Sequence, residues 1–254
     1  MLTATDHLIL AVTDPDAAAA ELEQRLGLTA TGGGRHEAHG TFNRLFWLGD
    51  SYIELMGVFD QSLAAGSWWG AHMARLLDSA PAAYAGMALT SDDLDSDLAR
   101  LRAQGAAILD PSAGERVRPD GDVVRWRIGR LSELDPELGL AFLIEHDISS
   151  AEWRPAERDA RAVQLHQLGT TGRLARVELP VPDVGATTLR LLRRLGLQFR
   201  PSLAGRGARD TTIGTQLLRV VPSAAGGVPL ITIRAGRERQ EAELLGCRWL
   251  LEPA

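Results

Sequence analysis

One pattern occurs three times along this chain: a short apolar strand, an acidic turn, and an amphipathic helix that stops at a glycine. The three copies span residues 6–28, 83–106 and 173–197. An aspartate follows each strand, where its carboxylate can cap the helix and favourably meet the helix dipole. A glycine then stands where a left-handed residue would end the helix. Because caps, spacing and length all recur, the sequence predicts a repeated supersecondary unit.

Strand-like segments follow each helix. In the first copy, Thr41–Leu48 and Ser51–Val58 are separated by Gly49-Asp50, a strong hairpin signal. The corresponding segments of the later copies are residues 123–128 and 140–148, then 211–213, 216–221 and 228–234. The unit is therefore predicted to be βαβββ, which makes the chain an α+β protein built from repeated modules.

These modules divide the chain into three parts. We predict two paired modules over residues 1–150, with a Trp-rich insertion at about residues 60–80 that forms an amphipathic helix. Residues 151–172 are polar and irregular, which indicates a linker. Residues 173–254 are predicted to be a third, degenerate βαβββ module.

Composition narrows the classes of function. A net charge of -6 over 254 residues argues against a nucleic-acid partner. The single cysteine, Cys247, excludes an intrachain disulfide framework and suits a reducing compartment. The apolar run near the N-terminus is too short for a signal peptide, and no run reaches the roughly 18 residues needed to cross a bilayer. We therefore expect a cytoplasmic protein with no membrane partner.

The first module carries a resemblance to a known family. The segments DHLILAV and GDSYIELMGV are similar to those of vicinal-oxygen-chelate (VOC) proteins, the glyoxalase/bleomycin-resistance fold. More closely, GGRHEAHGTFNRLFWLGDSYIEL together with VVRWRIG and AFLIEHD resembles the glyoxalase-like domain family. The resemblance implies that two modules curl into a cup-shaped mixed sheet with helices outside. It covers residues 5–148 well and the third copy only weakly.

The resemblance also implies where metal ligands would lie, on the first and last strands of each module. These positions are His7 and Glu54 in the first copy, and Gly86 and Glu145 in the second. The predicted set is therefore His7, Glu54 and Glu145, holding a divalent zinc, nickel, manganese or iron ion. One imidazole and two carboxylates suit such an ion and leave positions open for water and substrate.

Glu54 and Glu145 are the predicted catalytic residues. Each lies in an apolar run, YIELM or LAFLIEH, where an unpaired carboxylate facing the core would be costly. A metal could polarise a carbonyl or stabilise an enediolate while a carboxylate moves a proton on the adjacent carbon. That chemistry would serve an isomerase, epimerase or lyase acting on a small oxygenated metabolite. An extradiol dioxygenase would need a second histidine where this chain has Gly86.

Several polar and aromatic residues are candidates for substrate binding. On the first hairpin, Asn43 is a predicted ligand contact and Trp47 a predicted wall of the cup. Arg125 and Arg127 could bind a substrate carboxylate or phosphate if they point inward, and would be solvated if they point outward. His146, next to Glu145, should point to the opposite face of its strand and is not included as a ligand.

The third copy departs from the metal pattern. Its aligned positions are Arg176 and Arg219, two cations that cannot ligate a metal. These arginines could pair with carboxylates, hold an anion or support packing, and the copy itself could cover the core or form a homodimer contact. The missing ligand at Gly86 keeps an alternative function open, namely a metal-free protein that binds or sequesters a small molecule.

Overall fold

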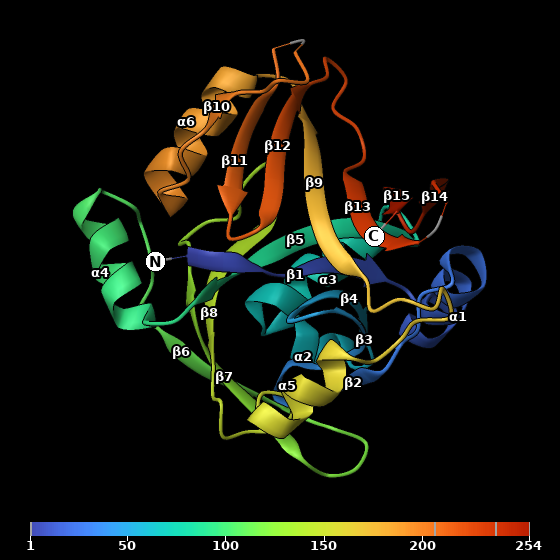
Figure 1. Cartoon of the computed structure of the whole chain (residues 1–254). Coiled ribbons are helices and arrows are strands. Elements are labelled where there is room, and N and C mark those ends of the chain that lie inside the picture. The colour runs from blue at the N-terminus through green and yellow to red at the C-terminus, as the bar shows by residue number, and fades with distance from the viewer. Residues whose placement is uncertain (1, 206, 237, 254) are drawn as a thin grey trace.

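Two β-sheets organise the molecule. The computed structural model describes residues 2–205, 207–236 and 238–253. Within these residues, strands β1 to β8 form a closed barrel in the order β1-β4-β3-β2-β6-β7-β8-β5, and strands β9 to β15 form a seven-stranded sheet. Figure 1 shows the second sheet, with α6 beside it, standing on one side of the barrel. The fold is α+β with a curved, closed sheet, which confirms the predicted class.

The barrel consists of two βαβββ modules. The first comprises β1 (Leu2–Val12), α1 (Pro15–Leu26), β2 (Gly32–His36), the short 3₁₀ helix η1 (Glu37–His39), β3 (Thr41–Leu48) and β4 (Ser51–Val58). The second comprises β5 (Ala82–Ser91), α4 (Leu94–Ala103), β6 (Ser112–Val117), β7 (Val123–Arg130) and β8 (Leu140–His146). In each module the first strand pairs in parallel with the last, β1 with β4 and β5 with β8. The modules join along antiparallel β1 and β5, and through a single pairing of β2 with β6.

The helix caps explain why the repeat was visible in the sequence. The Asp14 carboxylate accepts hydrogen bonds from two backbone N–H groups of α1, and Asp93 and Asp183 cap α4 and α6 (Val184–Leu195) in the same way. Gly27 ends α1 with φ of 64°, and Gly196 ends α6 with φ of 70°. Only glycine adopts this left-handed conformation without steric cost.

The C-terminal sheet contains one further module and part of another. Its elements besides α6 are β9 (Arg173–Val181), β10 (Arg200–Pro201), β11 (Arg209–Ile213), β12 (Gln216–Pro222), β13 (Leu230–Gly236), β14 (Gln240–Leu244) and β15 (Cys247–Pro253). β9 pairs in parallel with β12, as β1 does with β4. β13 then pairs antiparallel with β9 and parallel with β15. β13 to β15 therefore repeat the edge strands of a module without its helix, so residues 173–254 hold more than a single degenerate copy.

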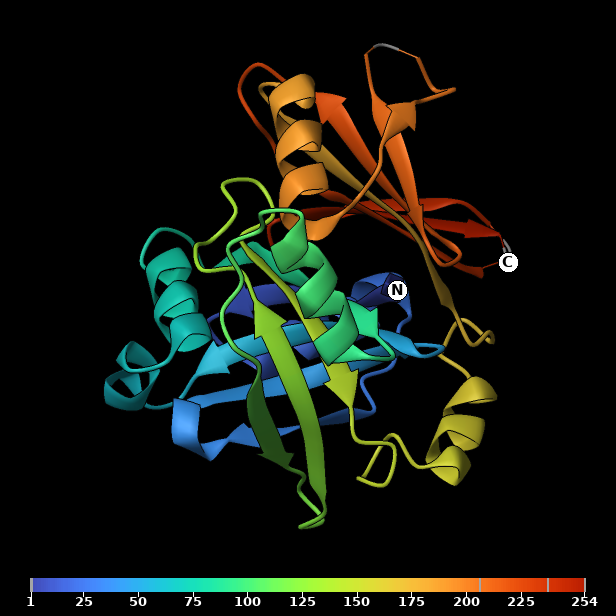
Figure 2. The same cartoon turned by 90° about the vertical axis from the view of Figure 1, so that its left-hand side faces the viewer.

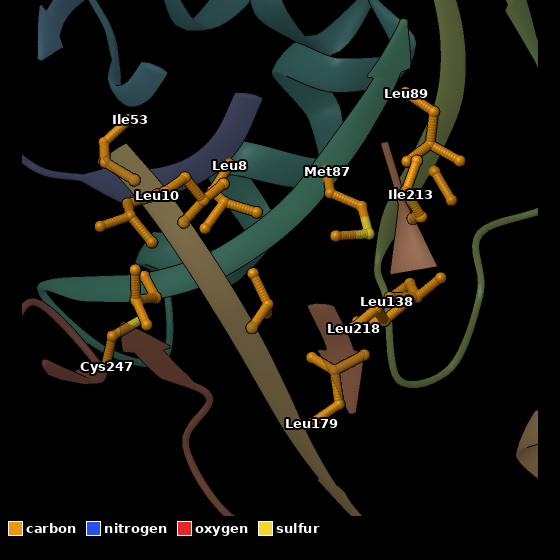
Figure 3. Close-up of a cluster of buried hydrophobic side chains, with 14 of the residues drawn as sticks. Leu8, Leu10, Ile53, Met87, Leu89, Leu138, Leu179, Ile213, Leu218 and Cys247 are labelled. Carbon is orange, nitrogen blue, oxygen red and sulfur yellow. The ribbon is translucent and has the colours of Figure 1, made fainter. Parts of the chain in front are cut away.

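A shared hydrophobic core joins the barrel to the C-terminal sheet. Leu8, Leu10 and Met87 on the outer faces of β1 and β5 belong to the same buried cluster as Leu179 and Leu218 of the second sheet. Figure 3 shows these side chains facing one another across the gap between the sheets. Figure 2 shows α4 of the barrel and α6 of the C-terminal sheet close to one another on the same side of the molecule. The outer faces of β1 and β5 are thus covered, and the inner face of the barrel remains for a site.

Two segments complete the barrel. The Trp-rich insertion forms α2 (Gln61–Ala65) and α3 (Trp68–Leu77); α3 packs on β1, β4 and β5, and α2 packs against α3 and η1. The segment predicted to be an irregular linker contains α5 (Pro155–Ala162), seen as the yellow helix beside the barrel in Figure 1. No helix among residues 2–205, 207–236 and 238–253 is long and apolar enough to span a membrane.

Candidate functional site

The inner face of the barrel encloses a small cavity of about 50 Å³. Its polar lining comes from both modules and from the segment before α5: His7, His36, Asn43, Tyr52, Glu54, Arg116, His146 and Glu152. Its apolar lining is Ile9, Leu45, Met56, Trp69, Val124, Trp126, Ile128, Leu140, Phe142, Ile144 and Trp153. A concave, mostly apolar cavity with a few convergent polar groups is the usual form of a small-molecule site.

A bulge in β1 places an acidic side chain beside His7. The register between β1 and β5 shifts between Thr5 and His7, leaving Asp6 without an opposite residue. Such bulges re-aim side chains and are common next to active sites. The Asp6 carboxylate is fully buried and lies 2.7 Å from His7 Nδ1. Because the Asp6 carboxylate accepts a hydrogen bond from the Nδ1–H of His7, the Nε2 of His7 is left facing the cavity.

Glu54 on β4 faces that nitrogen. Its Oε2 lies 3.5 Å from His7 Nε2, longer than a good hydrogen bond, so both atoms retain capacity for a ligand. Its Oε1 accepts a 2.5 Å hydrogen bond from Asn43 Nδ2. The side-chain oxygen Oδ1 of Asn43 accepts a 2.9 Å hydrogen bond from the Gly34 backbone N–H. The Gly34 contact fixes which way the Asn43 amide points. Asp6 therefore holds His7, Asn43 holds Glu54, and the His7 and Glu54 side chains face one another at the cavity wall.

A second histidine completes the Asp6 network. His146 Nε2 lies 2.9 Å from Asp6 Oδ2, and the Thr90 hydroxyl donates to the same oxygen. Burial alone would raise the pKa of Asp6, but the charge and hydrogen bonds of His146, together with those of His7, outweigh it and hold that pKa well below its usual range. The His146 ring stacks on Trp153 with centroids 3.6 Å apart. Its Nδ1 is buried and has no hydrogen-bond partner.

Two further titratable groups stay neutral at pH 7. Burial, reinforced by the positive charge of Arg116, lowers the pKa of His36 to about 3. Burial and the nearby Asp6 and Glu54 carboxylates raise the pKa of Tyr52 well above its usual value. The Tyr52 ring stacks on His7 with centroids 4.5 Å apart, which fixes the imidazole plane.

Arg116 on β6 forms a buried ion pair at another part of the wall. Its Nη2 donates a 2.6 Å hydrogen bond to Glu152, and the two side chains are only 4% and 9% exposed. Its Nη1 is buried without a hydrogen-bond partner. Glu152 has a φ of 67°, which is uncommon for any residue other than glycine. Its backbone N–H donates to Glu157 and its carbonyl accepts from Arg161, which together hold this conformation.

Glu145 does not join His7 and Glu54 in the structure. Its carboxylate accepts hydrogen bonds from the Leu94 backbone N–H and from Arg127 on the outer side of the barrel. Strand register gives the reason. Ile9 pairs with Glu54. Ala88 is the counterpart of Ile9 when β5 is aligned with β1 on their acidic turns, and it pairs with Phe142. Phe142 therefore occupies the position that matches Glu54, and His146, which strand alternation from Glu145 had left out of the ligand set, lies on the inner face.

The donor set does not fit the predicted metal ion. Of the three predicted ligands, only His7 and Glu54 approach one another, through Nε2 and Oε2, and the other oxygen of Glu54 accepts a hydrogen bond from Asn43. Across the described ranges 2–205, 207–236 and 238–253, no group of three or more His, Cys, Asp or Glu side chains is arranged to hold a metal. Protein metal sites of the expected kind use at least three such ligands.

The four predicted substrate-binding residues lie in different places. Asn43 lines the cavity, whereas Trp47 lines a neighbouring groove and packs against Tyr52 and Trp153. Arg125 and Arg127 point outward, 55% and 42% exposed, and pair with acidic residues of the outer surface. Both border an open groove that shares Trp126 and His146 with the cavity.

The third copy keeps the register of the first but not its chemistry. Arg219 pairs in the sheet with Glu178, as Glu54 does with Ile9, so it occupies the position matching Glu54. Its guanidinium donates two hydrogen bonds to Asp210, and Arg176 lies 3.1 Å from Glu178. Of the roles left open for these two arginines, the structure shows pairing with carboxylates.

Of the eight polar residues that line the cavity, the sequence predicted three: His7, Asn43 and Glu54. Asp6 carried no signal, because its orientation depends on a bulge that only the strand register reveals. His36 lies on β2 and is 4% exposed, although the glycine-rich sequence GGGRH gives no strand signal. Strand alternation did place His146 opposite Glu145, and a correct register would have moved it into the site. Arg116 and Glu152 come from segments with no periodic pattern.

Comparison with known proteins agrees with this architecture. A family model described as "Glyoxalase-like domain" matches residues 5–196. The chain belongs to the glyoxalase-like domain family. The resemblance to VOC proteins expected from the first module is thereby confirmed, and the match extends through the second module into α6. Among curated proteins, none matches the chain.

Solved structures support the fold. A hypothetical protein from Staphylococcus aureus is similar over 100% of both chains, with 16% identity and a TM-score of 0.80. A variant of 4-hydroxymandelate synthase from Streptomyces coelicolor shares 11% identity over 92% of this chain and 71% of its own, with a TM-score of 0.57. Methylmalonyl-CoA epimerase from Mycobacterium tuberculosis shares 25% identity over 57% of this chain and 88% of its own, with a TM-score of 0.44. The first two of these likenesses show the fold, and at identities of 16% and 11% they show nothing beyond it.

Proposed function

We propose that this glyoxalase-like protein is an enzyme of the isomerase or epimerase class that moves a proton on a small oxygenated metabolite. The proposal rests on one observation: His7 Nε2 and Glu54 Oε2 oppose one another at 3.5 Å in an enclosed cavity. A base and an acid within reach of the same small molecule are what proton abstraction beside a carbonyl requires.

The proposed step uses the two side chains in distinct roles. Glu54 takes a proton from the carbon next to a substrate carbonyl, and the C–H electron pair moves to form an enol. The carbonyl oxygen takes the proton carried by His7 Nε2. Asp6 behind His7 stabilises the imidazolium that donates this proton, and Asn43 holds the Glu54 carboxylate in place. Reversal at the neighbouring carbon, or from the other face, gives the isomerised product.

The metal-dependent version of this function, predicted from the sequence with Glu145 as third ligand, has less support from the donor set. Lewis-acid stabilisation of an enediolate would use the same two residues, so the difference is testable in the same assay.

The first experiment is hydrogen exchange into small carbonyl compounds. Hydroxyacetone, dihydroxyacetone and 2-oxobutyrate are incubated with the protein in D₂O, and proton NMR follows the C–H signals beside the carbonyl. We expect loss of signal in at least one compound above the uncatalysed rate. Glu54→Gln should slow that exchange by at least about 100-fold, within the range of a lost general base. Glu145→Gln, the same change outside the cavity, should leave it within about twofold.

A chelator separates the two versions. Exchange that survives EDTA supports chemistry by the side chains alone. Exchange that is lost in EDTA and restored by manganese, nickel, zinc or iron(II) supports the metal-dependent enzyme. Equal exchange by wild type and Glu54→Gln would contradict both.

A second candidate is a binding protein without chemistry. It is favoured by the aromatic walls and by the small volume of the cavity, about 50 Å³, which suit retention of a compact ligand. Ligand binding without exchange in any compound would support this candidate.

A further inference from the structure

We infer that Arg116 is the anchor for a carboxylate of the substrate, and that Glu152 occupies this anchor when no substrate is bound. The inference rests on the proposed function and names its substrate class, a small 2-oxo or 2-hydroxy carboxylic acid.

The first argument is the unused hydrogen-bonding capacity of the cavity. Arg116 is 4% exposed, lines the cavity and spends Nη2 on Glu152, while its Nη1 has no partner. A buried guanidinium N–H without an acceptor costs free energy unless a ligand supplies the oxygen. A carboxylate has two oxygens to offer a guanidinium, and arginine is the side chain best matched to it.

The second argument is the way Glu152 reaches Arg116. Glu152 is the middle residue of the segment 151–153, outside the barrel strands, and its backbone is held at a φ of 67°. Non-glycine residues in this conformation are uncommon and concentrate at ligand-binding and switch sites. Glu152 therefore fills, from outside the barrel strands, a place on Arg116 that the carboxylate of a small ligand could also fill.

The third argument is where Glu152 can go. It lines both the cavity and a neighbouring open groove, which is bordered by Arg118 and Arg161. A modest movement of its side chain would leave the cavity and stay close to cationic partners. The departure would free the charge of Arg116 and enlarge a cavity that is otherwise only about 50 Å³. Asp6 would keep its contact with His146, and Glu54 its place beside His7.

Calorimetric titration with a matched pair of compounds tests the anchor. The probes are 2-oxobutyrate and pentane-2,3-dione, which replaces the carboxylate by a neutral acetyl group of similar size. Wild type should bind 2-oxobutyrate at least about 10-fold more tightly than the dione, the low end of what a charged hydrogen bond contributes. Equal affinity for the two would overturn the inference without requiring any variant to fold.

Two variants separate an anchor from a structural ion pair. Arg116→Gln should weaken 2-oxobutyrate binding by about 10-fold or more, whereas Glu152→Gln should tighten it, because the internal competitor loses its charge. If the pair only supports the fold, both variants will weaken binding alike, and that result contradicts the inference.

The exchange assay keeps the two proposals apart. Tight, Arg116-dependent binding of 2-oxobutyrate without deuterium uptake would retain the anchor and reject the enzyme. Deuterium uptake that is unchanged in Arg116→Gln would retain the enzyme and reject the anchor.

Discussion

At the scale of single residues, Asp6 determines the chemistry of the site although it is not itself exposed to a ligand. Its carboxylate holds the imidazoles of His7 and His146 in defined orientations. An acceptor with several donors around it stays ionised even when fully buried. The same arrangement makes Asp6 a source of stability, because the folded state stabilises the ionised Asp6 carboxylate more than the unfolded chain does.

Asp6→Asn should therefore destabilise the protein in a way that depends on pH. Because the folded pKa of Asp6 lies below its ordinary value of 3.8, its stabilisation is present above that value and is lost as pH falls toward the folded pKa. We expect the free energy of unfolding of the wild type to exceed that of Asp6→Asn by on the order of 3 kcal/mol at pH 5. Urea unfolding at pH 5 and pH 3 should show this difference shrinking. A difference that stays constant or grows toward pH 3 would contradict the assigned charge state.

At the scale of elements, the sequence predicted what local signals determine and missed what pairing determines. Strands β3 and β4 have the predicted bounds, because Gly49-Asp50 fixes their hairpin. β2, with the sequence GGGRH, has little intrinsic preference for a strand and exists because it pairs with β3 and meets β6. The Glu145 assignment failed for the same reason, since register between β5 and β8 is a long-range property.

Gly86 on β5 gives an element-scale prediction. A Cβ at this position would lie 2.2 Å from the Leu140 carbonyl oxygen of β8, so Gly86→Ala must push two paired strands apart. We expect a loss of about 3 kcal/mol in unfolding free energy, at the upper end of overpacking costs. Gly105→Ala is the control, because nothing lies within 4 Å of its Cβ and only its φ of 88° is unfavourable. That variant should lose about 1 kcal/mol. Equal losses in denaturant titrations would show that β8 tolerates the contact.

At the scale of the whole molecule, the C-terminal sheet is part of the core that shapes the cavity. β1 is buried on both faces: His7 and Ile9 face the cavity, while Leu8 and Leu10 face the second sheet. The position of His7 therefore depends on packing contributed by residues that follow the paired modules. The division at residue 150, predicted from the repeated modules, is a division of the repeats along the chain, and the hydrophobic core crosses it (Figure 3).

Because the core is shared, a cavity made in the C-terminal sheet should loosen the barrel as well. Leu218 on β12 is 1% exposed, and Leu218→Ala should cost about 2 to 5 kcal/mol. Leu203 is fully exposed, so Leu203→Ala should change stability by no more than about 0.5 kcal/mol. Native-state hydrogen exchange read by mass spectrometry should show equal loss of protection in peptides from β1 and β12 of Leu218→Ala. Loss confined to β12 would mean that the sheet opens by itself, and that His7 keeps its place without it.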